Sequence, residues 1–420
     1  MKGYWKAFVA GIMIISMGVL VTSIPVHAEK ILKVGVIGPF TGGSARTGEE
    51  IKNTAKMAFE SIGYKVGDYK IKLVYIDTQG DPAKAASAYS EAAERQGVQA
   101  TICGWYSSVM LALMDLAAKY EIPNVGSMGG ASSAVEKYKS GPKYKGLWMR
   151  GYPIVSKLSI AYVQLLEDAI KSGKFKPAKK TVALYGIDND WGREVVGGLK
   201  KSFESKGWMI VSSDFFSKTQ TDFYPLMGKY KKKGVAVLAG SSSAPAVSAA
   251  FIKQAAEIGV KSVIINDGLG WIGEWYKLTG KASNGVFDMI PKFGTKKAKT
   301  WAEAYKKKYG YAPGATASGL NHDNVHFFIK ILKETLKKYG KLDKKTIRKL
   351  IVDEVCPGKL TYGQKDGAIM VKKIAYNPKT FNDPIVGTDY WFLPVIQYMN
   401  GKSYIVYPKD LREKEPVFKK

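Results

Sequence analysis

Two adjacent serines stand where a predicted strand ends and a predicted helix begins. Ser107 and Ser108 follow an apolar run at 98–104 and open a helical pattern at 107–120. Hydroxyl groups in the first turn of a helix, together with its free N–H groups and its dipole, favour an anion such as a carboxylate. A simpler interpretation is that Ser107 only caps the helix, and the motif taken alone favours that simpler interpretation.

Catalytic and metal-binding alternatives find less support in the sequence. Ser107 lacks the GxSxG surroundings of a hydrolase nucleophile, and the histidines of the mature chain lie more than 200 positions away. These histidines, His322 and His326, form an i,i+4 pair without the third ligand that zinc requires. Asp188 and Asp190 lack the further oxygen ligands of a calcium loop, and GPFTGG matches neither common nucleotide-binding pattern. We therefore expect no enzyme activity, no cofactor and no metal.

Short apolar runs alternate with helical patterns over most of the chain, in two series separated near residues 146–153. The strand-like runs lie at 31–38, 69–77, 98–104, 122–128, 181–187, 208–216, 235–241 and 262–267. Such alternation predicts βαβ units and parallel sheets covered by helices. We therefore predict an α/β fold with two Rossmann-like lobes, whose ligands bind at the carboxyl ends of the strands. Ser107 lies at such a strand end.

The last third of the chain departs from this alternation. Helical patterns at 297–309, 318–339 and 343–355 precede strand-like runs at 369–376, 390–398 and 402–407. These elements must complete the two lobes, so we expect the chain to cross between the lobes more than once.

The N-terminus has the features of a secretory signal peptide. A basic start is followed by an apolar run of roughly 15 residues and by a cleavage-like site at Val26-His27-Ala28. The apolar run is shorter than the roughly 20 residues that a membrane span needs. We therefore predict a signal peptide at 1–28 and a periplasmic mature protein that begins near Glu29, without a lipid anchor.

The chain is strongly basic, with a formal net charge of +28. Only six of its 64 basic residues are arginine, the residue that matches guanine in sites that read DNA bases. Most lysines lie at the solvent-facing ends of predicted helices, as in YKKKYG. Export also argues against a nucleic-acid partner, so we interpret the lysines as a solvated basic exterior.

The two cysteines, Cys103 and Cys356, lie far apart in the sequence. An oxidising compartment would permit a disulfide between them. Two buried free thiols are the alternative, which the sequence favours.

Four stretches of the chain resemble the periplasmic leucine/isoleucine/valine-binding proteins in order and spacing. They are VGVIGPFTGGSARTGEEI, DTQGDPAKAASA, CGWYSSVMLALMDLAAKYEIPNVGS and GIDNDWGREVVGGLKKSFESKG. The resemblance covers nearly the whole mature chain. It implies a type I periplasmic binding fold, in which a monomer closes two lobes on a small-molecule ligand. Such proteins deliver the ligand to the membrane permease of an ABC importer.

The resemblance also implies how the chain is divided between the lobes. The first lobe would comprise residues 29–150 plus 291–372, and the second lobe residues 151–290 plus 373–420. Three crossing segments would lie near 150–153, 288–291 and 371–376.

Several candidate ligand residues follow from the resemblance, position by position. Ser107 stands where the family's serine contacts the ligand α-carboxylate. Met128 to Ser132 match the next loop, in which Gly130 replaces the family's usual threonine and Ser132 is a substitute hydroxyl. Trp191 stands where the family has a tyrosine before a glycine, and we expect it to cover a ligand from the second lobe.

Two charged residues extend this set of candidates. Asp267 stands where an acidic residue pairs with the ligand ammonium, although the family usually has glutamate there. Arg46 occupies a position where a neutral residue is expected, and its guanidinium could hold a carboxylate through two parallel hydrogen bonds. Trp105, Tyr106 and Ser108 complete the predicted ligand-binding residues.

The sequence leaves the ligand class open. A serine and an aspartate that face each other across a cleft fit an α-amino acid, and a branched-chain or related amino acid is favoured. The missing threonine, the added Arg46 and the many aromatic residues would also fit an amide or an aromatic or aliphatic carboxylic acid. A ligand-sensing module with the same fold is a further alternative.

Overall fold

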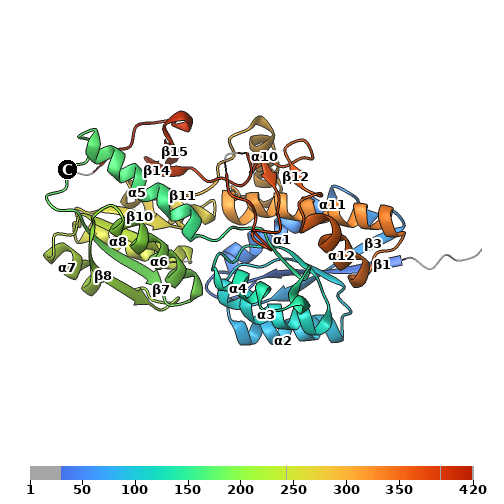
Figure 1. Ribbon diagram of the computed structural model, residues 1–420. Coiled ribbons are helices and arrows are strands. Elements are labelled where there is room, and N and C mark those ends of the chain that lie inside the picture. The colour runs from blue at the N-terminus through green and yellow to red at the C-terminus, as the bar shows by residue number, and fades with distance from the viewer. Residues whose placement is uncertain (1–29, 243, 388, 419–420) are drawn as a thin grey trace, which may run out of the picture.

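Two separate sheets, each flanked by helices, form two lobes in the computed structural model of the protein (Figure 1). The structure describes residues 30–242, 244–387 and 389–418. The predicted signal peptide at 1–28 lies outside these residues. Within the described part of the chain, no helix is both long and apolar enough to cross a membrane.

The first sheet has the strand order β2-β3-β1-β4-β5-β6. Its strands are β1 Lys30–Gly38, β2 Lys65–Val66, β3 Tyr69–Asp77, β4 Ala100–Cys103, β5 Asn124–Ser127 and β6 Trp148–Arg150. Strand β1 pairs in parallel with β3 on one side and with β4 on the other. The order of the strands therefore reverses beside β1, and the loops that follow β1 and β4 diverge at this switch point.

The second sheet has the strand order β15-β14-β11-β10-β9-β7-β8. Its strands are β7 Thr181–Ile187, β8 Met209–Phe216, β9 Val237–Ser241, β10 Val263–Asp267, β11 Phe287–Met289, β14 Val395–Met399 and β15 Lys402–Tyr407. The strands from β8 to β11 are parallel, whereas β14 and β15 add two antiparallel strands at one edge. The order reverses beside β7, so this lobe repeats the switch point of the first lobe. The predicted α/β fold with two Rossmann-like, largely parallel lobes is confirmed.

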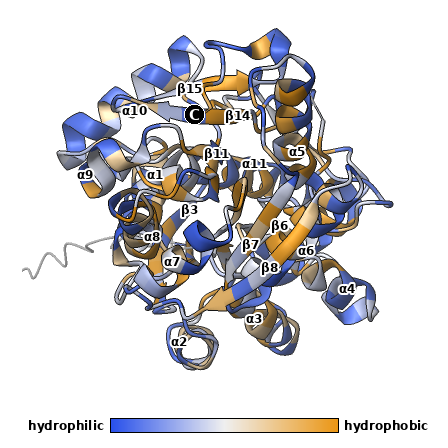
Figure 2. Cartoon of the chain, turned by 90° about the vertical axis from the view of Figure 1, so that its left-hand side faces the viewer, coloured by the Kyte–Doolittle hydropathy of each residue, from blue (hydrophilic) through white to orange (hydrophobic). Residues whose placement is uncertain are grey.

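Helices cover both sheets and connect their strands. They are α1 Ala45–Glu60, α2 Pro82–Glu94, α3 Ser107–Tyr120, α4 Ser133–Lys139, α5 Ser156–Lys171, α6 Asp190–Glu204, α7 Tyr224–Lys232, α8 Pro245–Glu257, α9 Trp275–Thr279, α10 Lys296–Tyr309, α11 Asn321–Tyr339 and α12 Lys344–Leu350. Short 3-10 or π turns flank several of them, including η2 Leu269–Trp271 and η4 Ala315–Leu320. The outward faces of peripheral helices such as α4 and α10 are hydrophilic (Figure 2). All six lysines of α10 are exposed, as expected for a solvated basic exterior.

The last third of the chain contains less strand than its sequence pattern predicts. Within 369–376, only Lys373–Ile374 (β13) forms a strand, paired with Tyr362–Gly363 (β12). The backbone N–H groups of residues 369–371 instead donate to the carboxylate of Asp323 on α11, at 2.8–3.1 Å. Because these donors are already satisfied by a side chain, they do not join a sheet.

A buried ion pair joins two segments that pass between the lobes. Arg150, at the end of β6, lies 2.9 Å from Asp383, and both side chains are almost completely buried. The Asp383 carboxylate also accepts hydrogen bonds from the backbone of Ile154 and from Lys157. The chain after β6 and the chain before β14 are therefore fixed to each other beside the cavity described below.

Both cysteines are free thiols. Cys103 is buried at the end of β4, and Cys356 is partly buried beside Tyr138 and Met149. The alternative of two free thiols, rather than a disulfide, is the arrangement observed.

Candidate ligand-binding site

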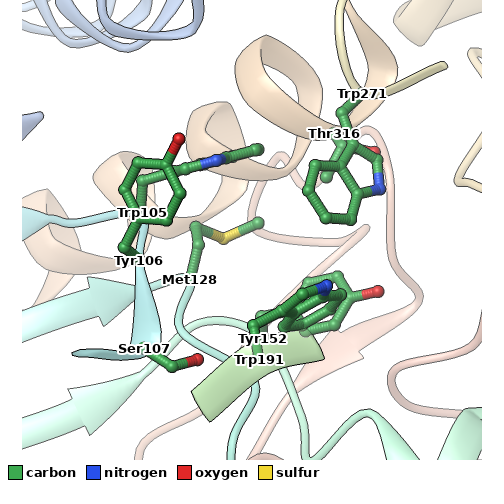
Figure 3. A pocket seen from close by; sticks show the side chains of 8 residues that line it. All are labelled: Trp105, Tyr106, Ser107, Met128, Tyr152, Trp191, Trp271 and Thr316. Atoms are coloured by element: carbon green, nitrogen blue, oxygen red, sulfur yellow. The ribbon is translucent and has the colours of Figure 1, made fainter. Parts of the chain in front are cut away.

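A cavity lies between the two lobes, at the carboxyl ends of strands from both sheets (Figure 3). It is lined by Trp105, Tyr106, Ser107, Met128, Tyr152, Trp191, Trp271 and Thr316. The cavity volume is only about 20 Å³. The lining side chains therefore lie close together, and a solute enters only when they move apart.

The loop between β4 and α3 forms one wall of the cavity. Cys103 and Gly104 have φ angles of 65° and 118°, so the chain turns sharply at the end of the strand. Glycine tolerates this left-handed backbone conformation, whereas most residues do not. Tyr106 is the N-cap residue of α3, and no side chain caps this helix. The simpler interpretation of Ser107 as a capping residue is therefore wrong.

Ser107 instead connects two loops of the first lobe. Its Oγ accepts a hydrogen bond of 3.2 Å from the backbone N–H of Ala131, in the loop after β5. Among the described residues, no acceptor is recorded for the Ser107 hydroxyl hydrogen. Figure 3 shows this hydroxyl pointing toward the interior of the cavity. Ser107 can therefore donate to a ligand, beside the free N–H groups of the first turn of α3.

Tyr106 fixes the same wall to the loop that follows β1. Its hydroxyl lies 2.5 Å from the Oγ of Ser44, and both groups are buried. The ring also lies against Gly80, where a Cβ atom would approach within 2.8 Å. Because its hydroxyl already has a partner, Tyr106 presents mainly its ring to the cavity.

Trp191 reaches the cavity from the start of α6 in the second lobe. Asn189 caps this helix by accepting a hydrogen bond from Gly192 N, which fixes the first turn. The Trp191 Nε1–H donates to Ser241 at the end of β9, at 2.9 Å. A Cβ atom on Gly130 would lie 2.2 Å from the indole, so the glycine at this position allows the first lobe to approach Trp191.

Trp271 belongs to a turn that a buried carboxylate holds in place. The backbone N–H groups of Gly268 and Gly270 donate to Asp288 at 2.9 and 2.8 Å, and the Tyr398 hydroxyl donates at 2.7 Å. Burial raises the pKa of Asp288 to about 6, although these hydrogen bonds oppose the shift. Asp288 thereby positions the η2 turn that carries Trp271.

Four aromatic side chains surround the cavity, and we call them the aromatic cage: Trp105, Tyr152, Trp191 and Trp271. Trp271 lies at 80° to Trp105 and at 80° to Trp191, with ring centroids 5.5 and 5.2 Å apart. Tyr152 lies at 65° to Trp191, with centroids 5.7 Å apart. The cage therefore presents neighbouring rings at steep angles to one another.

Three further donors at the cavity have no partner in the structure. They are the Tyr152 hydroxyl, the Trp271 Nε1–H and the Thr316 hydroxyl, all on residues that are at least 95 % buried. Buried polar groups normally have hydrogen-bond partners. No lining residue is acidic, and each of these three groups has a hydrogen to donate. This composition suits a ligand that carries acceptor atoms.

Asp267 does not line the cavity, although the sequence predicts that it faces a ligand. Its Oδ2 accepts a hydrogen bond of 3.0 Å from Tyr162 on α5, and its Oδ1 has no partner. Burial, followed by the charge of Asp288, raises the pKa of Asp267 well above its ordinary value. In this structure the carboxyl group thus belongs to the interior of the second lobe.

Arg46 and Ser132 also lie outside the lining, because each is bound to a partner in the opposite lobe. Arg46 pairs with Glu274 at 3.3 Å, besides Glu49 on its own helix. The Ser132 hydroxyl donates to Glu194 at 2.6 Å. These two predicted ligand residues therefore hold the lobes together around the cavity.

Two other predicted residues lie next to the cavity rather than in its lining. Ser108 lines a neighbouring groove between the lobes, and Gly130 lies behind Trp191. Three lining residues, Tyr152, Trp271 and Thr316, were not among the predicted ligand residues. Tyr152 lies in the stretch that separates the two series of strands, and Thr316 lies in a π turn between two helices. Tyr152 follows the three-residue strand β6, which the apolar pattern did not reveal, and Thr316 follows no strand.

The possible metal ligands that the sequence suggested do not form a metal site. The rings of His322 and His326 lie 4.3 Å apart, and burial lowers the pKa of His326 to about 3. His322 is bonded to Asp323, whose carboxylate holds residues 369–371. Among the described residues, no group of three or more side chains is placed to hold a metal ion.

Comparisons with known proteins agree with this architecture. The structure of a putative branched-chain amino acid ABC transporter protein from Silicibacter pomeroyi superposes with a TM-score of 0.70 at 17% identity, covering 93% of this chain and 99% of that one. A solute-binding protein of an ABC transporter from Rhodopseudomonas palustris BisB5, in complex with 3,4-dihydroxybenzoic acid, also has a TM-score of 0.70. It is 23% identical and covers 89% of this chain and 95% of that one. At these identities the likeness establishes the fold.

Sequence comparison identifies the family. Leu/Ile/Val-binding protein homolog 6 from Brucella melitensis is 27% identical over 234 residues, which cover 55% of this chain. The match spans 56% of that relative, so the chain covers about half the length of this curated protein. The sequence profile of the periplasmic binding protein family matches residues 31–371. The chain therefore belongs to the periplasmic binding protein family.

Proposed function

We propose that the protein is the extracytoplasmic solute-binding component of an ABC importer, and that it closes its two lobes on a small organic carboxylate. The main support for this proposal is the set of unpartnered donors at the cavity, next to the Ser107 hydroxyl and the N-terminus of α3. A carboxylate supplies acceptor atoms for these donors and benefits from the helix dipole. The Rhodopseudomonas relative, crystallised with an aromatic acid, supports this ligand class.

An α-amino acid fits the cavity less well than a simple carboxylic acid. The ligand ammonium would need acceptors or a counter-charge, and a buried charge without a partner is costly. No acidic residue lines the cavity, and Asp267 is bonded to Tyr162. We therefore favour the carboxylic acid that the sequence left as an alternative over a branched-chain amino acid.

Ligand capture requires the lobes to separate and then close. The cavity is narrow, and polar contacts between the lobes surround it: Arg46 with Glu274, Ser132 with Glu194, and Lys218 with the carbonyl of Gly80 at 3.0 Å. Hinge closure of two domains around a ligand is a recognised property of periplasmic binding proteins. A carrier of this kind binds its solute without chemical change and passes it to a membrane permease.

Replacing Ser107 with alanine should weaken binding of the carboxylate by about 1–3 kcal/mol, the usual cost of leaving a buried polar group without a partner. A thermal-shift screen of carboxylic acids, amides and amino acids identifies the solute first, because binding stabilises the native state. Calorimetric titration of Ser107→Ala with that solute then measures the loss. Ser108→Ala is the matched control, since Ser108 lines the neighbouring groove. Equal affinities of the two variants would contradict the proposed site.

Replacing Asp267 with asparagine separates the two ligand classes. For a carboxylic acid we expect affinity within a few fold of wild type, because the Asp267 side chain is bonded to Tyr162 and does not line the cavity. An α-amino acid that depended on Asp267 would lose its counter-charge, at a cost of about 3–5 kcal/mol. Calorimetric titration of the variant with the identified solute decides between them. A loss of that size would refute the assignment to a carboxylic acid.

A further inference from the structure

The aromatic cage encloses its space in a way that favours a rounded chemical group. Trp271 meets both Trp105 and Trp191 at 80°, and Tyr152 meets Trp191 at 65°. A flat aromatic ligand binds best between two parallel walls, whereas this cage has walls that face the cavity from different directions. A compact group with methyl groups on all sides can contact each wall.

The lining also lacks a carboxylate that would pair with a primary ammonium. The Tyr152 and Thr316 hydroxyls and the Trp271 Nε1–H are unpartnered, and the Trp191 Nε1–H is already bound to Ser241. A primary ammonium would bring three more donors to a lining that has no carboxylate. A quaternary ammonium has no N–H group, so it needs no acceptor, and aromatic faces attract its charge.

The charge behind the cage supports the same conclusion. Burial raises the pKa of Tyr152 well above its ordinary value, and the charges of Asp267 and Asp288 raise it further. Asp288 lies behind the η2 turn that carries Trp271, which is one wall of the cage. Asp288 is held by four hydrogen bonds and does not reach the lining. It provides a negative field on this side of the cavity without blocking the space.

We propose that the cavity binds a betaine-class solute, with its methylated quaternary ammonium in the aromatic cage and its carboxylate at Ser107 and the N-terminus of α3. This inference rests on the proposed function and specifies the part of the ligand that is attached to the carboxylate group. The ligand is a zwitterion whose positive end is stabilised by aromatic faces rather than by an acidic side chain. It is compact, in agreement with the small cavity.

Four probes of similar size test the proposal by calorimetric titration of the full mature protein. They are glycine betaine, tert-butylacetate, benzoate and L-leucine. In tert-butylacetate, a neutral carbon replaces the charged quaternary nitrogen of glycine betaine. We expect glycine betaine to bind at least about tenfold more tightly than tert-butylacetate, because the two probes differ only in the positive charge of the quaternary group. The positive charge of the chain attracts the anion tert-butylacetate at long range more strongly than the net neutral glycine betaine. Tighter binding of glycine betaine would therefore have to overcome this effect.

Substitution of one cage residue provides the second measurement. Trp105→Phe retains an aromatic ring but weakens its attraction for a cation, so we expect a loss of about three- to tenfold for glycine betaine and a smaller loss for tert-butylacetate. Trp301→Phe, on α10 and outside the cage, is the matched control and should leave both affinities unchanged.

The outcomes distinguish this inference from the proposed function. If tert-butylacetate or benzoate binds as tightly as glycine betaine, the betaine assignment is overturned, and a carboxylate carrier remains. Preferential binding of L-leucine overturns both the betaine assignment and the choice of a carboxylic acid. Absence of binding by all four probes also overturns the betaine assignment. The proposed function then fails only if the wider carboxylate screen and the Ser107→Ala comparison fail as well.

Discussion

Replacing Asp383 with alanine lowers the free energy of unfolding by about 3–5 kcal/mol, which is the expected cost of leaving a buried charge without its partner. The Arg150 guanidinium is fully buried and lies 2.9 Å from this carboxylate. Its remaining N–H groups donate to the carbonyl of Gly129 at 3.1 and 2.8 Å, and they cannot neutralise the charge. Urea unfolding of wild type and variant at one pH measures the difference.

The chain offers a matched control for this variant. Asp389 pairs with Lys372 at 3.4 Å, but both side chains are more than half exposed. Exposed ion pairs contribute about 0–1 kcal/mol, so Asp389→Ala should change stability little. Similar losses in the two variants would show that Arg150 and Asp383 do not form a buried pair. Because Arg150 also holds Gly129 beside Met128, Asp383→Ala should in addition weaken ligand binding.

The stability of the wild-type protein relative to a Glu50→Gln variant should fall as the pH rises from about 4.5 to about 7. Glu50 is completely buried on α1, and burial raises the pKa of its carboxyl group from 4.5 to about 7. Gly314 N, Ser318 Oγ and Gly273 N donate to it and only partly oppose the shift.

The direction follows from proton linkage. A raised pKa means that the native state binds the proton more tightly than the unfolded chain does. The resulting stabilisation is present below about pH 4.5 and is lost as the pH rises through 7. Its size is on the order of 3 kcal/mol for a shift of this magnitude. Glu50→Gln cannot titrate, so its stability relative to wild type should increase by that amount between pH 4.5 and 7.5.

Urea unfolding of wild type and Glu50→Gln at several pH values measures this difference. Asp288, whose pKa is raised to about 6, contributes in the same direction to both proteins and therefore cancels in the comparison. Parallel pH profiles for wild type and Glu50→Gln would show that the Glu50 carboxyl does not titrate as its burial requires.

The sequence predicted those parts of the site that depend on local pattern. Ser107 and Trp191 each follow a strand whose apolar run is visible in the sequence, and both line the cavity. The carboxyl ends of parallel strands share one edge of a sheet, so the pattern placed each residue at the binding edge of its own lobe. That the two edges face each other was implied by the resemblance to the leucine/isoleucine/valine-binding proteins. Met128 was predicted from the family resemblance, and it also lines the cavity.

The sequence could not predict which polar groups would be free. Asp267 ends a strand as expected, but Tyr162 on α5 binds it inside the lobe. Arg46 was expected at the ligand, but Glu274 in the other lobe binds it. In both cases the competing partner is more than 100 residues away in the chain. Only the packing of the folded chain determines such pairings, so they cannot be predicted from the local sequence.

A contact with a residue distant in the sequence also explains why the strand at 373–374 is so short. An apolar run at 369–376 has the pattern of a strand, yet Asp323 takes the N–H groups of its first three residues. A single buried carboxylate therefore overrides the local preference for a strand.

The most direct test of the central claim is a crystal structure of the protein with the solute that gives the largest thermal shift. The account predicts one ligand between the lobes, with its carboxylate within hydrogen-bond distance of Ser107 Oγ and the first N–H groups of α3. The body of the ligand should lie against Trp105, Trp191 and Trp271. A carboxylate bound at Arg46, a ligand ammonium paired with Asp267, or a ligand outside this cavity would contradict the account.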